Sequence, residues 1–377
     1  MTLVYIIMLF CLPGIVLSWV LPSKYQMIPS TVFTCAFLAI YSEFSLLALI
    51  LSSLVGFTCL TYIRNTRTAA FLSAGTSLLM LFIYKMQSLQ QFDNIDLQMI
   101  GISYYAFRQI HVAIEFYNGN IRKISALNYI TYLFFLPTLL VGPINTIGTF
   151  QKDTLRRRID PNMISVGLER VLYGLVKVSF LGNYLLSQKI DKWSMLQFEM
   201  NNIGAVFYHY IQAVKFVLNA YIQFSGYSDI AIGLSALFGY TIIENFNYPF
   251  KSISISEFWK RWHISLSNWC RQYIFLPLMA KTRSAAIALV VSMLVLGIWH
   301  EISLKYLIWA VIQGLALLVW KYYKESKLHF YLDQYKWNYM LSWFINFHFV
   351  VGSFYILSFN SFSGFIISLS SVFYHDI

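Results

Sequence analysis

Residues 285–299 read AAIALVVSMLVLGIW, an apolar run that ends directly before His300 and Glu301 and carries no charged side chain. A second apolar run follows at residues 304–320, and similar runs recur along the whole chain. Crossing a hydrocarbon core takes about 20 apolar residues in helical form. The sequence therefore predicts an all-α, polytopic membrane helix bundle with roughly 10–11 spans, including re-entrant and interfacial helices around a central tunnel.

The composition supports the same fold class. Of 377 residues, 58% are hydrophobic and 11% are charged, whereas about 25% of a soluble domain is usually charged. No linker, repeat or low-complexity tract divides the chain, so residues 1–377 are expected to form a single membrane domain. The N-terminal run lacks a basic segment before it and a small-residue cleavage site after it, which favours a retained first span over a signal peptide.

The basic residues give the chain a net charge of +11, but they stand in short stretches between apolar runs. That pattern is typical of cytoplasmic loops that face anionic lipid, so we expect a membrane-lipid partner and no nucleic-acid partner. The four cysteines are scattered without metal-ligand or disulfide spacing, and no metal site is expected.

Loop charge indicates an orientation. Arg64 and Arg122 lie in basic loops, while the loop between them carries Asp93 and Asp96 and no Lys or Arg. By the positive-inside rule the basic loops are cytoplasmic and the acidic loop is outside. The basic and aromatic stretch 244–283 is then also cytoplasmic, and its mixture of residues is typical of amphipathic helices at the membrane interface.

The apolar run 129–147 lies between two basic stretches, so a single crossing would place one of them outside. Pro137 and the Gly142-Pro143 pair interrupt the run, and proline breaks a continuous helix. We therefore expect a kinked or re-entrant element here, which is tolerated where it is buried in protein or lines a wet cavity.

Ionisable residues inside apolar segments are the candidates for function. Arg108, His111 and Glu115 share one helical face and are interpreted mainly as a structural cluster. Asp229 lies between apolar stretches near two glycines, and both a loop-holding role and substrate binding remain open. His209 and His348 are lone histidines in aromatic-rich spans, where such residues usually serve packing.

His263, in FWKRWHISLSNW, and His300, in LVLGIWHEIS, are the histidines with a candidate chemical role. The stretch GYSDIAIGLSALFGYTIIENFNYPFKSISISEFWKRWHISLSNWCRQYIFLPL at residues 226–278 resembles the signature region of the membrane-bound O-acyltransferase family. LGIWHEIS resembles the second histidine motif of that family, and residues 101–119 and 134–153 are similar to its bacterial branch, which acetylates alginate and D-alanylates teichoic acids.

The resemblance implies that His300 is the catalytic general base and that His263 is the second characteristic histidine. The family usually has glycine where this chain has Glu301. We expect the substrate-binding residues to include five polar or aromatic side chains near these motifs: Asn268, Asp229, Tyr227, Trp262 and Trp299.

The implied reaction transfers an acyl group, acetyl in the favoured interpretation, from a cytoplasmic thioester to a hydroxyl of a cell-surface polysaccharide. The donor is acyl-CoA or an acyl carrier protein thioester, and no tightly bound cofactor is expected. The expected partners are an extracytoplasmic glycan or a downstream acetyltransferase protein, and the expected location is the cell membrane. Two alternatives remain: D-alanyl transfer from a carrier protein to teichoic acid, and a transporter or flippase without chemistry of its own.

Overall fold

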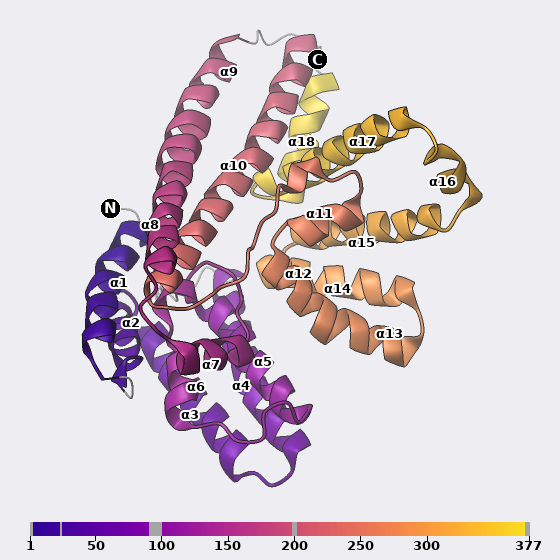
Figure 1. The fold of residues 1–377 in the computed structure, drawn as a ribbon. Helices are drawn as coiled ribbons and strands as arrows, with labels where there is room; N and C mark the ends of the chain where they lie inside the picture. The colour runs from indigo at the N-terminus through magenta and orange to yellow at the C-terminus, as the bar shows by residue number, and fades with distance from the viewer. Residues whose placement is uncertain (1–2, 23–24, 90–99, 198–201, 374–377) are drawn as a thin grey trace. The chain divides into compact units, whose positions relative to one another are not determined.

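The computed structural model describes residues 3–22, 25–89, 100–197 and 202–373, and within these ranges the chain is helical and contains no strand. The acidic loop residues Asp93 and Asp96 lie outside the described residues. The all-α fold class is therefore confirmed (Figure 1). The chain divides into two compact units, residues 1–175 with 227–243 and residues 176–226 with 244–377. They are called unit 1 and unit 2 below.

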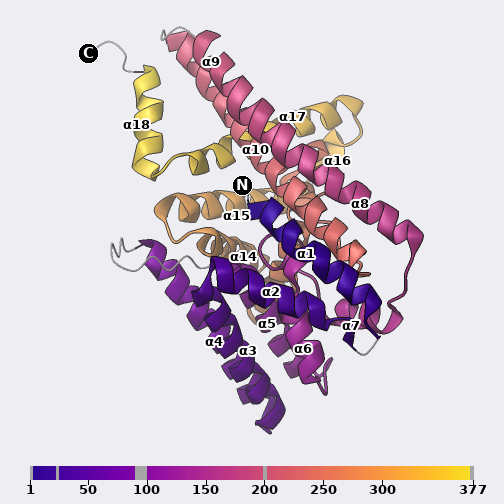
Figure 2. The same ribbon diagram turned by 90° about the vertical axis from the view of Figure 1, so that its left-hand side faces the viewer.

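Unit 1 begins with the neighbouring helices α1 (Leu3–Val20) and α2 (Ile28–Tyr41), followed by α3 (Glu43–Tyr62) and α4 (Thr66–Leu89). Figure 2 shows α3 and α4 side by side as an antiparallel pair. Helix α5 (Ile102–Tyr117) packs on both of them. The unit continues with α6 (Ala126–Leu133), the short 3-10 turn η2 (Leu136–Thr138), α7 (Ile147–Arg156) and α8 (Pro161–Leu175).

The run 129–147 is broken, as the sequence predicts. Helix α6 ends at Leu133, the turn η2 contains Pro137, and residues 139–146 form no helix. Arg108 of α5, which is 1% exposed, holds the break through its guanidinium. It donates to the carbonyls of Tyr132 at 3.2 Å and Leu133 at 3.3 Å. Because a buried carbonyl without a partner is costly, this arginine compensates for the lost helical bonds.

His111, one turn after Arg108, supplies a hydrogen-bond partner for the backbone at the other end of the break. The backbone N–H of Ile147 donates to His111 Nε2 at 3.1 Å, where α7 begins. Glu115 accepts from the side chain of Asn120 at 2.8 Å. These contacts support the structural interpretation of the Arg108 and His111 cluster.

Helix α10 (Asn202–Leu237) contributes residues to both units, and it corrects one expectation. The segment around Asp229 is not a loop but part of this continuous helix. In unit 1 the helix passes α8 at a glycine pair: a Cβ on Gly233 would lie 2.5 Å from the carbonyl oxygen of Gly167. The glycines therefore serve close helix packing, which is common between membrane helices, rather than a turn.

Unit 2 contains the π-helix η3 (Val176–Ile190), α9 (Asp191–Gln197) and most of α10. Short pieces follow: η4 (Pro249–Lys251), α11 (Ile255–Arg261), α12 (Ile264–Cys270), η5 (Arg271–Phe275) and α13 (Leu276–Thr282). Helices α14 (Ala285–His300) and α15 (Leu304–Lys324) form an antiparallel pair (Figure 1). The chain continues through α16 (Lys327–Leu332), α17 (Lys336–Tyr355), η6 (Ile356–Ser358) and α18 (Phe362–Phe373).

Four helical stretches among the described residues are long and apolar enough to cross a membrane: Glu43–Tyr62, Thr66–Met86, Leu304–Lys324 and Lys336–Ser358. Three shorter apolar helices join them: Tyr5–Val20, Ile28–Tyr41 and Ala285–His300. Some other predicted runs, such as 129–147, are divided into shorter helices, so fewer stretches qualify than the 10–11 spans expected from apolar runs alone. The protein is multi-pass.

The glycine pair between α8 and α10 yields a stability prediction. Gly233→Ala should lower the melting temperature of the detergent-solubilised protein, because its Cβ meets backbone atoms that cannot move aside, and such overpacking costs about 1–3 kcal/mol. Gly75→Ala in α4 is the matched control, since nothing lies within 4 Å of a Cβ there. Equal melting temperatures for the two variants would contradict close packing at Gly233.

Candidate active site

His263 occupies the turn between α11 and α12, two helices too short to cross a membrane. Its backbone is left-handed, with φ 46° and ψ 54°, and it forms the N-cap of α12 without a capping side chain. A left-handed conformation costs a residue with a side chain about 1–2 kcal/mol, and strained residues of this kind cluster at functional sites. The surrounding structure must therefore impose this geometry.

Asn245 is the residue that imposes it most directly. The carbonyl of Asn245 accepts the N–H of Ile264 at 2.9 Å, and its side-chain oxygen accepts the hydroxyl of Ser265 at 2.9 Å. Ser267 closes the other side of the turn, because its N–H donates to the His263 carbonyl at 3.0 Å. The turn is thus fixed by bonds to the non-helical segment that follows α10.

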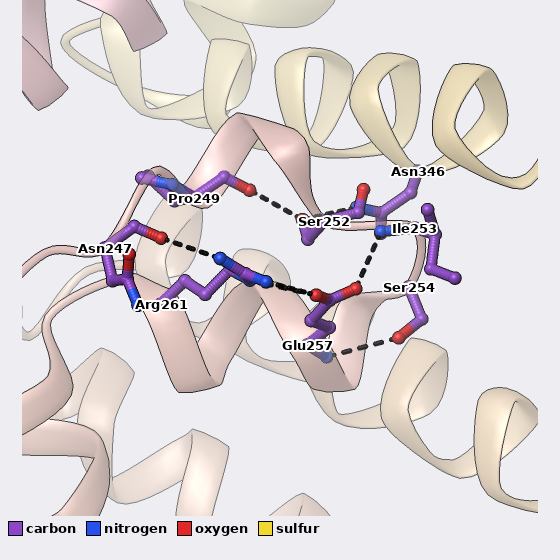
Figure 3. Close-up of polar contacts among 8 residues, drawn as sticks. All are labelled: Asn247, Pro249, Ser252, Ile253, Ser254, Glu257, Arg261 and Asn346. Carbon is purple, nitrogen blue, oxygen red and sulfur yellow. Dashed lines mark hydrogen bonds and ion pairs between the residues drawn. The ribbon is translucent and has the colours of Figure 1, made fainter. Parts of the chain in front are cut away.

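The segment leading to His263 is fixed by a second group of contacts (Figure 3). Glu257 accepts from Arg261 at 2.7 Å and from the backbone N–H of Ile253 at 3.0 Å. Asn346 of α17 donates to the carbonyl of Ser252 at 3.0 Å (Figure 3). Charged and amide side chains here supply the partners that an irregular backbone lacks.

The imidazole of His263 is 2% exposed and lies against aromatic rings. Its centroid is 4.6 Å from that of Phe224 and 6.3 Å from that of Trp299. Both ring nitrogens are buried, and neither has a hydrogen-bond partner among the described residues. Because a buried polar group without a partner costs about 1–3 kcal/mol, this imidazole is poised to bind a polar group of a ligand.

The electrostatic surroundings determine the charge of that ring. Burial lowers the pKa of His263, and the nearby His300 lowers it further. His263 is therefore neutral at pH 7, with one nitrogen able to donate and the other able to accept.

His300 ends α14 and is partly exposed. Its ring lies 4.5 Å from that of Trp299 and stacks on Tyr306 of α15 at 5.7 Å. Gly297, one turn earlier, permits this approach, since a Cβ there would lie 2.8 Å from the carbonyl oxygen of Tyr306. Trp299 thus contacts both histidines, and α14 and α15 together hold His300 at the site.

The other predicted residues of unit 2 occupy different surroundings. Trp262 is buried and stacks on Phe258 at 5.4 Å, so its ring supports the turn that carries His263. Asn268 lies on α12 with an exposed side chain. Trp299 is partly exposed between the two histidines.

Tyr227 and Asp229 belong to unit 1. Asp229 is buried and forms an ion pair with Arg170 of α8, with 2.6 Å between Oδ1 and Nη1. Tyr227 and residues such as Pro137 and Val141 line a cavity of about 200 Å³ in that unit. Asp229 therefore has a structural partner of its own, and Tyr227 faces an apolar recess.

Sequence reasoning missed Asn245 and Asn346. Both are buried amides in aromatic surroundings, and a lone polar residue among apolar neighbours is the signal that marks them. It also interpreted His209 as a packing group, and the structure agrees, because His209 Nδ1 bonds the hydroxyl of Tyr355 at 2.8 Å.

The contacts of Glu257 yield a prediction on local stability. Glu257→Ala should accelerate amide hydrogen exchange across residues 247–261, because Ile253 N–H and Arg261 both lose a charged partner. Glu325→Ala is the matched control, since Glu325 also pairs with a basic residue four positions away, Lys321, but is 61% exposed. Such exposed pairs contribute about 0–1 kcal/mol. An unchanged rate of amide hydrogen exchange at Ile253 in Glu257→Ala would show that this carboxylate does not stabilise the segment.

Comparison with known proteins gives several similar relatives, of which three represent the different named activities. The probable alginate O-acetylase AlgI of Pseudomonas aeruginosa is 32% identical over 224 residues, which are 58% of this chain and 42% of that protein. The teichoic acid D-alanyltransferase of Bacillus subtilis is 26% identical over 277 residues, 70% of this chain and 69% of that protein. The peptidoglycan O-acetyltransferase of Helicobacter pylori is 30% identical over 235 residues, 59% of this chain and 42% of that protein.

The chain thus spans less than half the length of the two acetylating relatives. Residues 33–362 match the sequence profile described as MBOAT, membrane-bound O-acyltransferase family, and this range contains both histidine motifs. The match covers most of the 377 residues. The chain belongs to the membrane-bound O-acyltransferase family.

Proposed function

We propose that this chain is an O-acyltransferase that moves an acyl group, preferentially acetyl, from a cytoplasmic thioester to a hydroxyl of a cell-surface polysaccharide. The observation that carries the proposal is the pairing of a partly exposed His300 with the buried His263 across Trp299. One imidazole is accessible to an acceptor, while the other has two buried nitrogens without partners among the described residues.

His300 acts as the general base in the proposed reaction. It takes the proton of the acceptor hydroxyl while that oxygen bonds to the thioester carbonyl carbon, and the carbonyl π electrons move onto the carbonyl oxygen. The carbonyl then re-forms, the carbon–sulfur bond breaks, and the leaving thiolate takes the proton from His300. The products are an ester and a thiol. A positioned base of this kind contributes about 10²–10⁴-fold to the rate.

The remaining site residues act on the substrates. His263, which is neutral at pH 7, hydrogen-bonds the donor carbonyl, and Asn268 lies on the donor side with its exposed amide. Trp299 and Trp262 enclose the reacting groups, and exclusion of water by such rings limits hydrolysis of the thioester. Tyr227 and Asp229 are proposed to contribute to substrate binding from unit 1.

The loop charges support the direction of transfer. Basic loops face the cytoplasm under the positive-inside rule, where acyl-CoA or an acylated carrier protein is found. The acceptor is then an extracytoplasmic glycan, or a partner acetyltransferase that passes the group on, and the protein resides in the cell membrane. Acetyl is preferred because two of the three relatives are named for O-acetylation.

D-alanyl transfer to teichoic acid is the second candidate. The teichoic acid D-alanyltransferase matches a longer part of this chain, 70%, than the alginate relative does, 58%. The two candidates share His300 and differ in the donor.

Removal of the base is the direct test. His300→Ala should abolish ester formation on envelope glycans, measured by mass spectrometry, while protein level and membrane insertion stay normal because the ring is only partly buried. His209→Gln is the matched control: this histidine lies in the same unit and bonds Tyr355 within the protein. Normal ester content in His300→Ala cells would remove His300 from the mechanism.

The donor is tested with the purified full-length chain. Acetyl-CoA and a D-alanylated carrier protein are each supplied with cell-envelope glycan, and ester formation is measured for both. Transfer of acetyl alone is the expected result, whereas transfer of D-alanyl alone selects the second candidate. No transfer from either thioester would contradict the proposed acyltransferase activity and favour a transporter or flippase.

A further inference from the structure

The first turns of α15 lie against His300. Tyr306 stacks on the imidazole at 5.7 Å, and the ring of Trp309 stands edge-on to it, with centroids 6.0 Å apart and planes at 84°. Residues three apart share one face of a helix, and helical side chains lean toward the helix N-terminus. Both rings therefore reach back over the start of α15, where the chain leaves His300.

Trp309 carries a polar group that has no role in the protein's own hydrogen bonding. The residue is 1% exposed, and its Nε1 is buried with no partner among the described residues. Two other indoles of unit 2 do have partners: Trp259 Nε1 donates to Gln313 at 3.2 Å and Trp343 Nε1 to the Phe250 carbonyl at 2.8 Å. Buried indole N–H groups usually find a partner, so an unpartnered one whose ring contacts His300 indicates a missing acceptor.

A second and independent observation concerns the N-terminus of α15. Ser303 is its N-cap residue, but the serine side chain makes no capping bond, and Ser303 Oγ is buried without a partner among the described residues. The first N–H groups of a helix have no intrahelical partner and carry a partial positive charge. The uncapped first turn of α15 and the unpartnered hydroxyl of Ser303 therefore follow His300 by three residues in the chain.

We propose that the indole N–H of Trp309, together with the hydroxyl of Ser303 at the uncapped first turn of α15, binds the carbonyl oxygen of the acyl group and stabilises the oxyanion formed there. This inference rests on the proposed function. When the acceptor oxygen bonds to the carbonyl carbon, the π electron pair moves onto the carbonyl oxygen, and that oxygen accepts the hydrogen bonds. His263 approaches the acyl group from a different part of the chain, the turn before α12.

The surroundings of Trp309 keep the donor in place. Its ring packs edge-on against Phe354 at 5.4 Å and against Trp259 at 5.9 Å. Gln313, one turn later, is bonded to Ser353 at 2.8 Å, so this face of α15 is tied to α17. Donors that are fixed before the reaction stabilise a developing charge without reorganisation, and loss of one costs about 10²–10³-fold in kcat.

Trp309→Phe tests the proposal, because it removes the N–H and keeps a large ring. The purified full-length protein is assayed with acetyl-CoA and envelope glycan, or with the D-alanylated carrier if that is the donor. We expect kcat to fall about 10²–10³-fold, with KM for the donor and the shape of the pH profile unchanged. The melting temperature should fall only through the loss of buried ring volume, since no hydrogen bond within the protein is lost.

Trp343→Phe is the matched control, because that indole N–H already has a partner. It should lower the melting temperature through the lost hydrogen bond and leave kcat unchanged, whereas Trp309→Phe lowers kcat. Ser303→Ala is the second variant and covers the case in which Trp309→Phe does not accumulate. It should lower kcat at an unchanged melting temperature.

The outcomes separate this inference from the function on which it rests. Wild-type kcat in Trp309→Phe overturns the inference alone, as does a shifted pH profile, which would mean that the ring acts by positioning His300. If Trp309→Phe does not accumulate, wild-type kcat in Ser303→Ala also overturns it. Full activity in His300→Ala, or no transfer by the wild type from either thioester, overturns the proposed function first.

Discussion

Backbone polar groups that leave water must find partners inside the protein, and this constraint governs every interrupted segment of the chain. In unit 1 the break after α6 is bonded by Arg108, a buried guanidinium that donates to successive carbonyls. In unit 2 Asn346 bonds the Ser252 carbonyl and Asn245 bonds the turn at His263. Long-range side-chain contacts thus replace helical bonds where the chain needs irregular geometry.

Against this background, the unsatisfied groups of unit 2 are informative. The nitrogens of His263, the indole N–H of Trp309 and the hydroxyl of Ser303 are buried without partners among the described residues. Such groups also occur elsewhere, for example at Asn145 in unit 1, so an unsatisfied atom alone does not mark a site. What distinguishes these three residues is their position near His300, which remains partly exposed. Trp309 contacts its ring, His263 contacts the Trp299 ring that also touches His300, and Ser303 follows three residues later in the chain.

Glu301 directly follows His300, and the structure gives its carboxylate a partner. Glu301 Oε2 lies 3.5 Å from Lys305 Nζ, and Lys305 also donates to the Phe359 carbonyl at 3.1 Å. Lys305 therefore links the turn after His300 to Phe359, the residue that follows η6. Because this ion pair is partly exposed, its contribution to the stability of the fold is modest. Its main consequence is to hold the conformation of the turn after His300.

The sequence by itself determined the fold class, the break at 129–147 and the two histidines, because apolar runs, prolines and short motifs are local signals. The tertiary structure alone decided that α10 continues through Asp229, that His263 is left-handed, and that Trp309 has an unused N–H. Those features depend on contacts between residues distant in the chain. A tryptophan in an apolar helix has the same pattern whether its N–H is bonded or free, so only the packed fold separates the two cases.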